Sequence, residues 1–430
     1  MSTLRALLLT ALLPAAAAAQ AADGFSVSED DLFSTPDLPL LAAASEPAAE
    51  EKKTVGLSGD LVTVIQDVVS STGAPGRLDT YAVANFALDA RLQRGYKAYA
   101  NMETTHYSST GETDFLLREA FVDFNLARRA WFRAGKQVLQ WGRCALWNPT
   151  DLVNVEKTPF IRKIGAREGA SGLKLHVPYG TRYNLYAFLD TGTAADDRDA
   201  AAAAKFEFLA GRTEMAFSAW NRRGAYPVLG YDISSRLGGL DIKGEVSASR
   251  RDNAYYIRED AGALSLYRKD REWPVRAALN LARGFRVGDF NDRLTVAAEL
   301  FYNPNGYASS PFRDRSAYAF TGPLALVSAT GTRGAYLLGN GLYEPNQLGR
   351  RYAALFTTFT RFIAADLALT GNYIRNLDDR SGAVTAGLTY ADINDFSAGF
   401  LATLFTGPAR SEYTYAGVRG LVQLTASVSF

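Results

Sequence analysis

Residues 422–430 end the chain with the sequence Val-Gln-Leu-Thr-Ala-Ser-Val-Ser-Phe. Apolar side chains occupy every second position from Val422 to Phe430, and polar side chains occupy the positions between them. Successive side chains of a β-strand point to opposite faces, so this pattern predicts a strand with one apolar and one polar face. A helix would instead gather its apolar residues at every third or fourth position.

The same period of two recurs along the chain from Val55 onward. It is clearest in segments 173–177, 240–249, 275–282 and 294–302, where apolar residues alternate with polar or small ones. Such strands fit two architectures. In a water-soluble sandwich the apolar face is the core, whereas in a transmembrane barrel it meets lipid and the polar face lines the lumen.

The connections between the strands favour the barrel, because they alternate in length. Short links lie near 94–95, 128–129, 178–180, 211–212, 238–239 and 364–365. Longer polar loops lie near 69–79, 108–114, 142–168, 190–203, 222–228, 252–272 and 303–350. Aromatic residues near the strand ends suit the two interfacial girdles of such a barrel. They are Tyr81, Tyr96, Trp131, Trp141, Tyr183, Trp220, Trp273, Tyr302, Tyr352 and Tyr390.

Counting the alternating segments predicts a single transmembrane antiparallel β-barrel of about 18 strands, with 16 as the alternative count. The expected strands are 55–68, 79–93, 95–107, 115–127, 130–141, 169–178, 182–190, 204–211, 213–222, 228–237, 240–251, 273–284, 293–302, 350–361, 365–376, 382–391, 396–406 and 417–430. An even number returns both termini to one side of the membrane, which we expect to be the periplasm.

The first 54 residues differ from the rest of the chain. Residues 1–21 have a basic start at Arg5, an apolar stretch from Ala6 to Ala19 and an Ala-Gln-Ala site, and this combination predicts a secretory signal peptide. Residues 22–54 are rich in Ala, Ser and Pro and carry eight acidic residues against two lysines, so we expect a disordered, acidic periplasmic extension. Residues 55–430 form the predicted barrel.

Composition narrows the chemistry. Lys plus Arg number 46 and Asp plus Glu 45, which argues against a nucleic-acid protein driven by bulk charge. One cysteine excludes an intramolecular disulfide framework and a Cys-rich metal site. The two histidines, His106 and His176, show no recognisable catalytic partner, so we expect no enzyme activity, cofactor or metal. Residues 55–430 hold 43 basic and 37 acidic residues, an excess that favours anions.

The fifth connection, residues 142–168, concentrates charged and aromatic residues. One interpretation is that its charges line a pore constriction or a solute site. The candidates are Arg143, Asp151, Glu156, Lys157, Arg162, Lys163 and Arg167. The other interpretation is that the loop packs on the wall with its charges in ion pairs, anchored by Trp141, Trp147, Asn148 and Pro149. Pro149 suits the first position of a helical turn.

Residues 135–154 contain G-K-Q, W-G and N-P-T-D in that order. They resemble a segment of uncharacterised bacterial outer-membrane barrels. The final strand, ending in Phe430, resembles the C-terminal signature that such proteins present to the barrel-assembly machinery. The resemblance implies an outer-membrane, porin-like β-barrel whose third extracellular loop, here the fifth connection, folds inward. It implies no substrate.

These observations predict a channel for passive or facilitated passage of small solutes through the outer membrane. The expected partners are outer-membrane lipid and a small-molecule solute, and the oligomeric state is open. The alternative is a barrel plugged by its own loops, because loop 303–350 is more apolar than a free surface loop needs to be. Such a barrel would be a transporter or exporter component for a hydrophobic or lipid-like solute, or a surface structural or adhesion protein.

Overall fold

The computed structural model describes residues 54–73, 75–92, 95–139, 141–153, 169–192, 194, 196–392 and 395–430. Residues 1–53 hold the expected signal peptide and nearly all of the expected acidic extension. They lie outside the described residues, so both assignments stay predictions.

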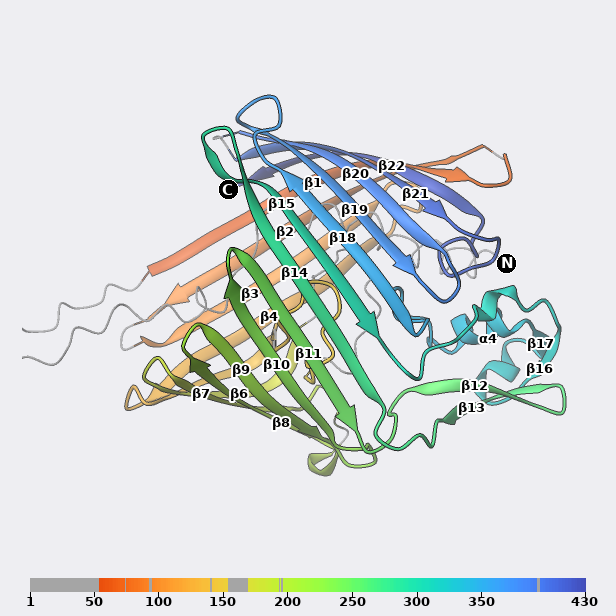
Figure 1. Cartoon of the computed structure of the whole chain (residues 1–430), viewed down its shortest axis with the longest axis horizontal. Helices are drawn as coiled ribbons and strands as arrows, with labels where there is room; N and C mark the ends of the chain where they lie inside the picture. Colours follow the sequence, from red (N-terminus) through yellow and green to blue (C-terminus); the bar gives the residue numbers. More distant parts are fainter. Residues whose placement is uncertain are drawn as a thin grey trace, which may run out of the picture.

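Eighteen strands form one closed antiparallel sheet, a barrel (Figure 1). Each strand pairs with the next in the barrel, and β1 pairs with β22 to close it. The predicted count of 18 is therefore confirmed. The strands are β1 (Thr54–Ser70), β2 (Arg77–Arg91), β3 (Lys97–Tyr107), β4 (Thr113–Leu126), β5 (Ala130–Gln137), β6 (Ala170–Tyr179), β7 (Tyr183–Asp190), β8 (Ala201–Ala210), β9 (Thr213–Asn221), β10 (Val228–Leu237), β11 (Leu240–Ser249), β14 (Val275–Val287), β15 (Phe290–Tyr302), β18 (Arg351–Phe359), β19 (Leu367–Asn376), β20 (Gly382–Ala391), β21 (Phe396–Thr406) and β22 (Val418–Ser429).

Several strands differ from their predicted bounds by three or more residues at one end, among them β5, β14 and β15. β14 and β15 are longer than expected and turn within Gly288-Asp289, because the pairing continues past a register shift between Phe285 and Val287. β5 is shorter than expected and ends at Gln137. The backbone N–H of Val138 donates to the Glu119 carboxylate at 2.9 Å, and the chain leaves the sheet there.

The two ends of the barrel differ (Figure 1). The short turns, the start of β1 and the end of β22 lie at one end, which we call the short-turn end. At the opposite end the connections after β11 and β15 form a second, four-stranded sheet. It contains β12 (Tyr255–Asp260), β13 (Ala263–Arg268), β16 (Tyr318–Phe320) and β17 (Thr330–Gly331), accompanied by α4 (Arg333–Gly339), η4 (Pro311–Arg313) and η5 (Pro323–Leu326). A further short helix, η3 (Asp197–Asp199), precedes β8.

This second sheet lies where loops were expected at 252–272 and 303–350, and the apolar residues noted in the second of them form part of its buried cluster. β12 and β13 form a hairpin, and β13 pairs in parallel with β16. A buried cluster holds the unit together, because Leu264, Phe320 and Leu337 pack with Tyr336 and Phe312. We call this unit, residues 255–268 and 307–348, the cap.

The outer face of the barrel is apolar and exposed. Large apolar side chains lie on alternate positions around the sheet. Examples are Leu57, Leu61, Ile65, Phe86, Met102, Leu117, Leu173, Phe206, Phe217, Leu279, Leu300, Leu355, Phe400 and Leu424. A soluble sandwich would bury this face, whereas a barrel in a bilayer presents it to lipid.

Five of the ten expected girdle aromatics are not on this face, because Tyr81 and Trp131 occupy lumen-facing positions of β2 and β5 and three more are buried. Trp141, Trp220 and Tyr352 are buried, while Tyr96, Tyr183, Trp273, Tyr302 and Tyr390 are exposed. The three buried rings pack against the loop that enters the barrel or are part of it. Proximity to a strand end does not distinguish a ring that points inward from one that points outward.

Among the described residues, no helix is long and apolar enough to span a membrane.

Candidate functional site

The connection after β5 enters the barrel, and we call its described part, residues 138–139 and 141–153, the inner loop. Apolar contacts seat it against the wall. Leu139, Trp141, Leu152 and Val153 pack with Tyr186, Phe188 and Trp220 of strands β7 and β9. Thr150 lies against Gly230 of β10, where a Cβ on the glycine would come within 3.3 Å of the Thr150 methyl group.

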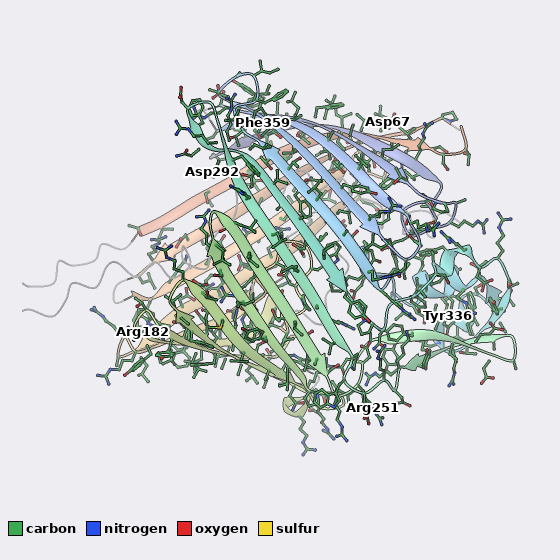
Figure 2. The ribbon with its side chains drawn as sticks, viewed as in Figure 1. Asp67, Arg182, Arg251, Asp292, Tyr336 and Phe359 are labelled. Atoms are coloured by element: carbon green, nitrogen blue, oxygen red, sulfur yellow. The ribbon has the colours of Figure 1, made fainter. Side chains whose placement is uncertain are left out.

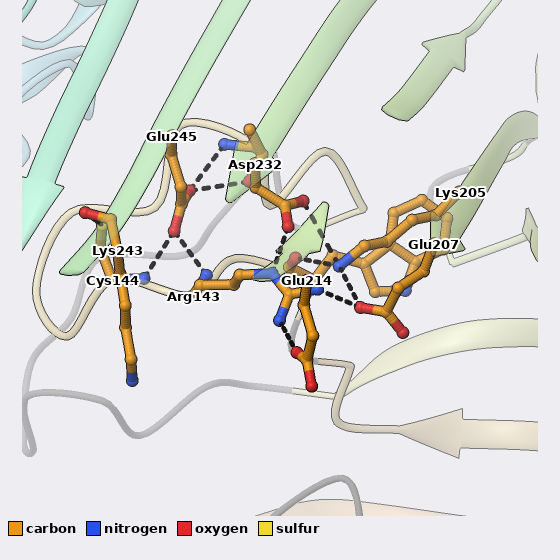
Figure 3. Close-up of polar contacts among 10 residues, drawn as sticks. Arg143, Cys144, Lys205, Glu207, Glu214, Asp232, Lys243 and Glu245 are labelled. Atoms are coloured by element: carbon orange, nitrogen blue, oxygen red, sulfur yellow. Dashed lines mark hydrogen bonds and ion pairs between the residues drawn. The ribbon is translucent and has the colours of Figure 1, made fainter. Parts of the chain in front are cut away.

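Arg143 lies in a cluster of carboxylates that the barrel wall supplies (Figure 3). Its guanidinium donates to Glu207 on β8, Glu214 on β9 and Asp232 on β10. Lys205 on β8 joins the cluster, because its ammonium lies 3.4 Å from Asp232 and donates to the backbone carbonyl of Trp141 at 2.8 Å. The guanidinium has several donors in a planar fork, which suits it to bind three carboxylates together.

Two further wall carboxylates hold the backbone of the inner loop. Glu245 on β11 accepts the N–H groups of Arg143 at 2.5 Å, Cys144 at 2.6 Å and Thr150 at 3.1 Å, and also the Thr150 hydroxyl at 2.8 Å. Glu299 on β15 accepts the N–H groups of residues 145, 146 and 147 at 2.9, 3.0 and 2.6 Å. Both side chains are almost fully buried. Burying a carboxylate is costly unless hydrogen bonds satisfy it, and here the loop amides satisfy both.

Trp147 anchors the middle of the inner loop to the wall and to the cap. Its indole stacks on Phe301, with ring centroids 5.6 Å apart and planes 7° apart. Its Nε1–H donates to the carbonyl of Asn346, a residue of the cap, at 2.8 Å. A turn follows, in which the N–H of Asp151 donates to the carbonyl of Asn148 at 3.1 Å and Pro149 occupies the second position. Trp147 therefore joins the inner loop to both the wall and the cap.

Glu412, in the connection between β21 and β22, makes a second junction between the wall and the cap. It is buried, and it accepts hydrogen bonds from the Tyr352 hydroxyl at 2.7 Å, Asn376 at 2.7 Å and the N–H of Asn346 at 2.8 Å. Burial raises the pKa of Glu412 to about 7, although the bonds from Tyr352 and Asn376 oppose that shift.

Asp252 anchors the cap hairpin to the barrel. It accepts hydrogen bonds from Tyr256 at 2.7 Å and Asn305 at 2.6 Å, and it pairs with Arg276 on β14 at 3.1 Å. Burial by itself would raise the pKa of Asp252, but Arg276 and the hydrogen bonds outweigh it and lower the pKa.

The lumen face is divided by charge. Buried charged residues lie on the wall from β5 to β15: Arg133, Lys174, Lys205, Asp232, Glu245 and Glu299. On β19–β21 the buried side chains are uncharged, and include Thr370, Asn372, Thr385, Leu401 and Thr403. The inner loop lies against the charged wall (Figure 3).

The structure brings together several of the sequence-predicted site residues. Arg143 lies in the carboxylate cluster and Asp151 is buried in the turn after Pro149. Trp141 and Trp147 are buried, and Asn148 packs against Gly142. The remaining candidates, Glu156, Lys157, Arg162, Lys163 and Arg167, lie outside the described residues.

Sequence reasoning missed the loop-binding role of the wall acids. Glu207, Glu245 and Glu299 were not among the site residues that the sequence predicted. Glu245 lies directly opposite another acid, Asp232, in the β10–β11 register. Two acids facing each other repel unless a cation or N–H donors intervene. Asp232 and Glu245, two acids at inward positions in the middle of neighbouring strands, could have indicated this role. Recognising that they face each other requires the strand register, which the sequence does not provide.

The histidines show no catalytic arrangement among the described contacts. His106 is exposed, with Nδ1 2.9 Å from the Thr113 hydroxyl, and His176 stacks on Tyr186 with ring centroids 4.5 Å apart. Within the part of the chain that the structure describes, no group of three or more His, Cys, Asp or Glu residues is placed to hold a metal ion.

A closed 18-stranded barrel with a loop folded inside is the architecture of a porin-type channel. Solved structures of Pseudomonas aeruginosa outer-membrane proteins share this fold. OccK2 (OpdF) in complex with glucuronate has a TM-score of 0.52 at 10% identity, with 87% of this chain and 98% of that chain covered. The outer membrane protein OprD also has a TM-score of 0.52 at 10% identity, covering 89% and 95%. OccD3 (OpdP) has the same score and identity, covering 97% and 99%.

At this identity the similarity establishes the fold. No family model matches the chain. No curated protein matches it.

Proposed function

We propose that this protein is a porin-like channel of the bacterial outer membrane, which passes small solutes through a lumen narrowed by the loop between β5 and β6. The observation that carries the proposal is the pinning of the inner loop. Six N–H groups of that loop donate to Glu245 or Glu299, two buried carboxylates of the barrel wall. A wall built to hold a loop inside the barrel fits a constriction of defined width.

Arg143 and Asp151 remain proposed constriction residues, together with Glu156, Lys157, Arg162, Lys163 and Arg167. The cluster around Arg143 combines two bases with three acids, so its local balance is negative. This balance favours cations, while the excess of basic residues over the whole barrel favours anions.

Single-channel conductance of the refolded protein in a planar bilayer tests the proposal. We expect stable steps that increase with salt concentration. The sign of the reversal potential in a salt gradient then shows which of the two charge balances controls selectivity. Silence from a protein shown to be folded and inserted would refute an open channel.

The packing of the cap supports a second candidate, a plugged barrel. The cap contacts both the inner loop and the wall through Asn346, whose carbonyl accepts from Trp147 and whose N–H donates to Glu412. A barrel closed in this way would serve as a transporter or exporter component for a hydrophobic or lipid-like solute, or as a surface structural or adhesion protein. A silent wild-type barrel that conducts once residues 307–348 are replaced by a short linker would favour this candidate.

We infer that the short-turn end faces the periplasm, with both barrel termini there, and that the final strand is the segment presented to the barrel-assembly machinery. Phe430 supports this inference, because it exchanges two backbone hydrogen bonds of 2.9 Å with Gly59 and its ring lies 6.3 Å from Phe86. The residue therefore sits at the seam where the barrel closes. Removing Phe430 should reduce the yield of assembled barrel in cells without changing the conductance of the refolded protein.

A further inference from the structure

Four arginines lie on three successive turns at the short-turn end, and we call them the arginine arc. They are Arg128 and Arg129 between β4 and β5, Arg182 between β6 and β7, and Arg212 between β8 and β9. All four are exposed, and Figure 2 shows Arg182 at this end of the barrel. No described residue forms an ion pair with any of them, and the turn segments 127–129, 180–182 and 211–212 contain no acid.

Other turns at the same end carry their own acids. Arg236 pairs with Asp241 at 2.9 Å, and Arg286 lies 4.0 Å from Asp289. Asp366 lies between β18 and β19, and Asp392 and Asp395 lie between β20 and β21. Arg283, Arg293 and Arg361 also lie at this end, but among Asp289, Asp292 and Asp366, whereas the turns of the arginine arc contain no acid. An anionic partner would therefore be recognised on the β4–β9 side of the barrel.

Each turn of the arginine arc lies above a pair of aromatic rings. Phe124 stacks on Phe132 with centroids 5.1 Å apart, Tyr179 and Tyr183 are 6.4 Å apart, and Phe208 and Phe217 are 6.1 Å apart. These residues alternate along their strands with the lumen-facing positions, so they lie on the outer, apolar face. Aromatic rings at that level are typical of the boundary between the hydrocarbon and the headgroups.

We propose that the arginine arc binds the phosphate groups of anionic phospholipids in the adjacent leaflet. The inference rests on the proposed membrane location. A guanidinium matches a phosphate with two parallel N–H···O bonds, and the aromatic pairs below give the acyl chains and glycerol region an amphipathic surface. Successive turns are two strands apart, roughly 10 Å, so each turn reaches a separate headgroup.

The acidic N-terminal extension is the competing occupant, because it also carries negative charge and joins the barrel at the same end. The aromatic pairs favour lipid. They lie on the outer, apolar face beneath every turn of the arc, at the level where a bilayer has to be accommodated.

The test compares two triple variants of the full chain. The arc variant carries Arg129→Gln, Arg182→Gln and Arg212→Gln. The matched control removes the same charge at the same end through Arg91→Gln, Arg236→Gln and Arg286→Gln, arginines that already have an acid nearby. Each protein is placed in phosphatidylethanolamine bilayers with a minor fraction of phosphatidylglycerol, and the phosphatidylglycerol that stays bound after extraction is quantified by native mass spectrometry.

We expect the parent and the control to retain phosphatidylglycerol, and the arc variant to retain roughly a hundredfold less, since each of its three substituted arginines contributes about fivefold in affinity near an anionic surface. Inorganic phosphate should not displace the lipid. Equal retention by all three proteins, or equal loss in both variants, would overturn the proposal. The proposal would also be overturned if the parent bound phosphatidylglycerol only after residues 23–51 were deleted, because the extension would then be the occupant of the arginine arc. Conductance is measured in parallel: a conducting parent without lipid retention refutes this inference but not the channel.

Discussion

Replacing Glu299 by glutamine should release the inner loop from the wall. One carboxylate oxygen of Glu299 accepts from Leu146 and Trp147, and the other accepts from Ala145 and the amide of Asn280 at 2.9 Å. Glutamine converts one of these oxygens into a donor. In either orientation two hydrogen bonds are lost, and two N–H groups then face another N–H group.

The magnitude follows from those two bonds. A hydrogen bond to a charged group contributes about 1.5–3 kcal/mol, so two of them contribute about 3–6 kcal/mol. Relief from burying a charge offsets part of this, and we expect a net weakening of the loop anchor of about 3 kcal/mol. Because 1.36 kcal/mol corresponds to a factor of ten, the opening equilibrium of the loop should rise on the order of a hundredfold.

Hydrogen exchange measured by mass spectrometry gives the readout. The N–H groups of residues 145–147 should exchange on the order of a hundredfold faster in the Glu299→Gln protein, while the strands keep their protection. Glu103→Gln is the matched control, because Glu103 is also an acid of the barrel wall and its described partner is Arg118, at 3.1 Å, rather than the loop. Unchanged exchange at 145–147 in Glu299→Gln would refute the assignment of Glu299 as an anchor.

Three further predictions concern the inner loop and its junction with the cap. Arg143→Gln leaves three wall carboxylates without their cation, so the reversal potential should show increased cation selectivity. Adding Asp232→Asn should partly restore the parent value. An identical reversal potential in all three proteins would contradict a role of the Arg143 cluster in selectivity. Because the pKa of Glu412 is raised in the folded state, its contribution to stability is complete below a pH of about 4.5 and is lost as the pH rises through about 7. The free energy of unfolding should fall by about 3 kcal/mol over this range. Thermal unfolding of Glu412→Gln should therefore depend less on pH than that of the parent. Gly142→Ala would place a Cβ 2.4 Å from Oδ1 of Asn148, so we expect about 1–3 kcal/mol of destabilisation and faster proteolysis of the loop. Gly56→Ala, whose Cβ would meet no atom closer than 4.0 Å, should leave the loop protected.

Alternating hydropathy along the sequence was sufficient to predict the barrel. Each strand of a barrel in lipid has to be apolar on one face and polar on the other, and this local constraint is written into segments such as 240–249 and 422–430. The short turns are equally local, which is why the predicted strand count holds. The same reasoning located the loop after β5 and its tryptophans, because a long aromatic segment between two strands needs no knowledge of distant residues.

The partners of that loop required the tertiary structure. Arg143 meets Glu207, Glu214 and Asp232 from three different strands, and Glu299 reaches the loop from more than 150 positions along the chain. A two-residue period shows that an acid faces the lumen, but it does not show what lies across the lumen from it. That depends on register and closure, which place Asp232 opposite Glu245 and β1 beside β22. The sequence by itself therefore determined which face of each strand meets lipid, and only the closed barrel decided which wall acids bind the loop.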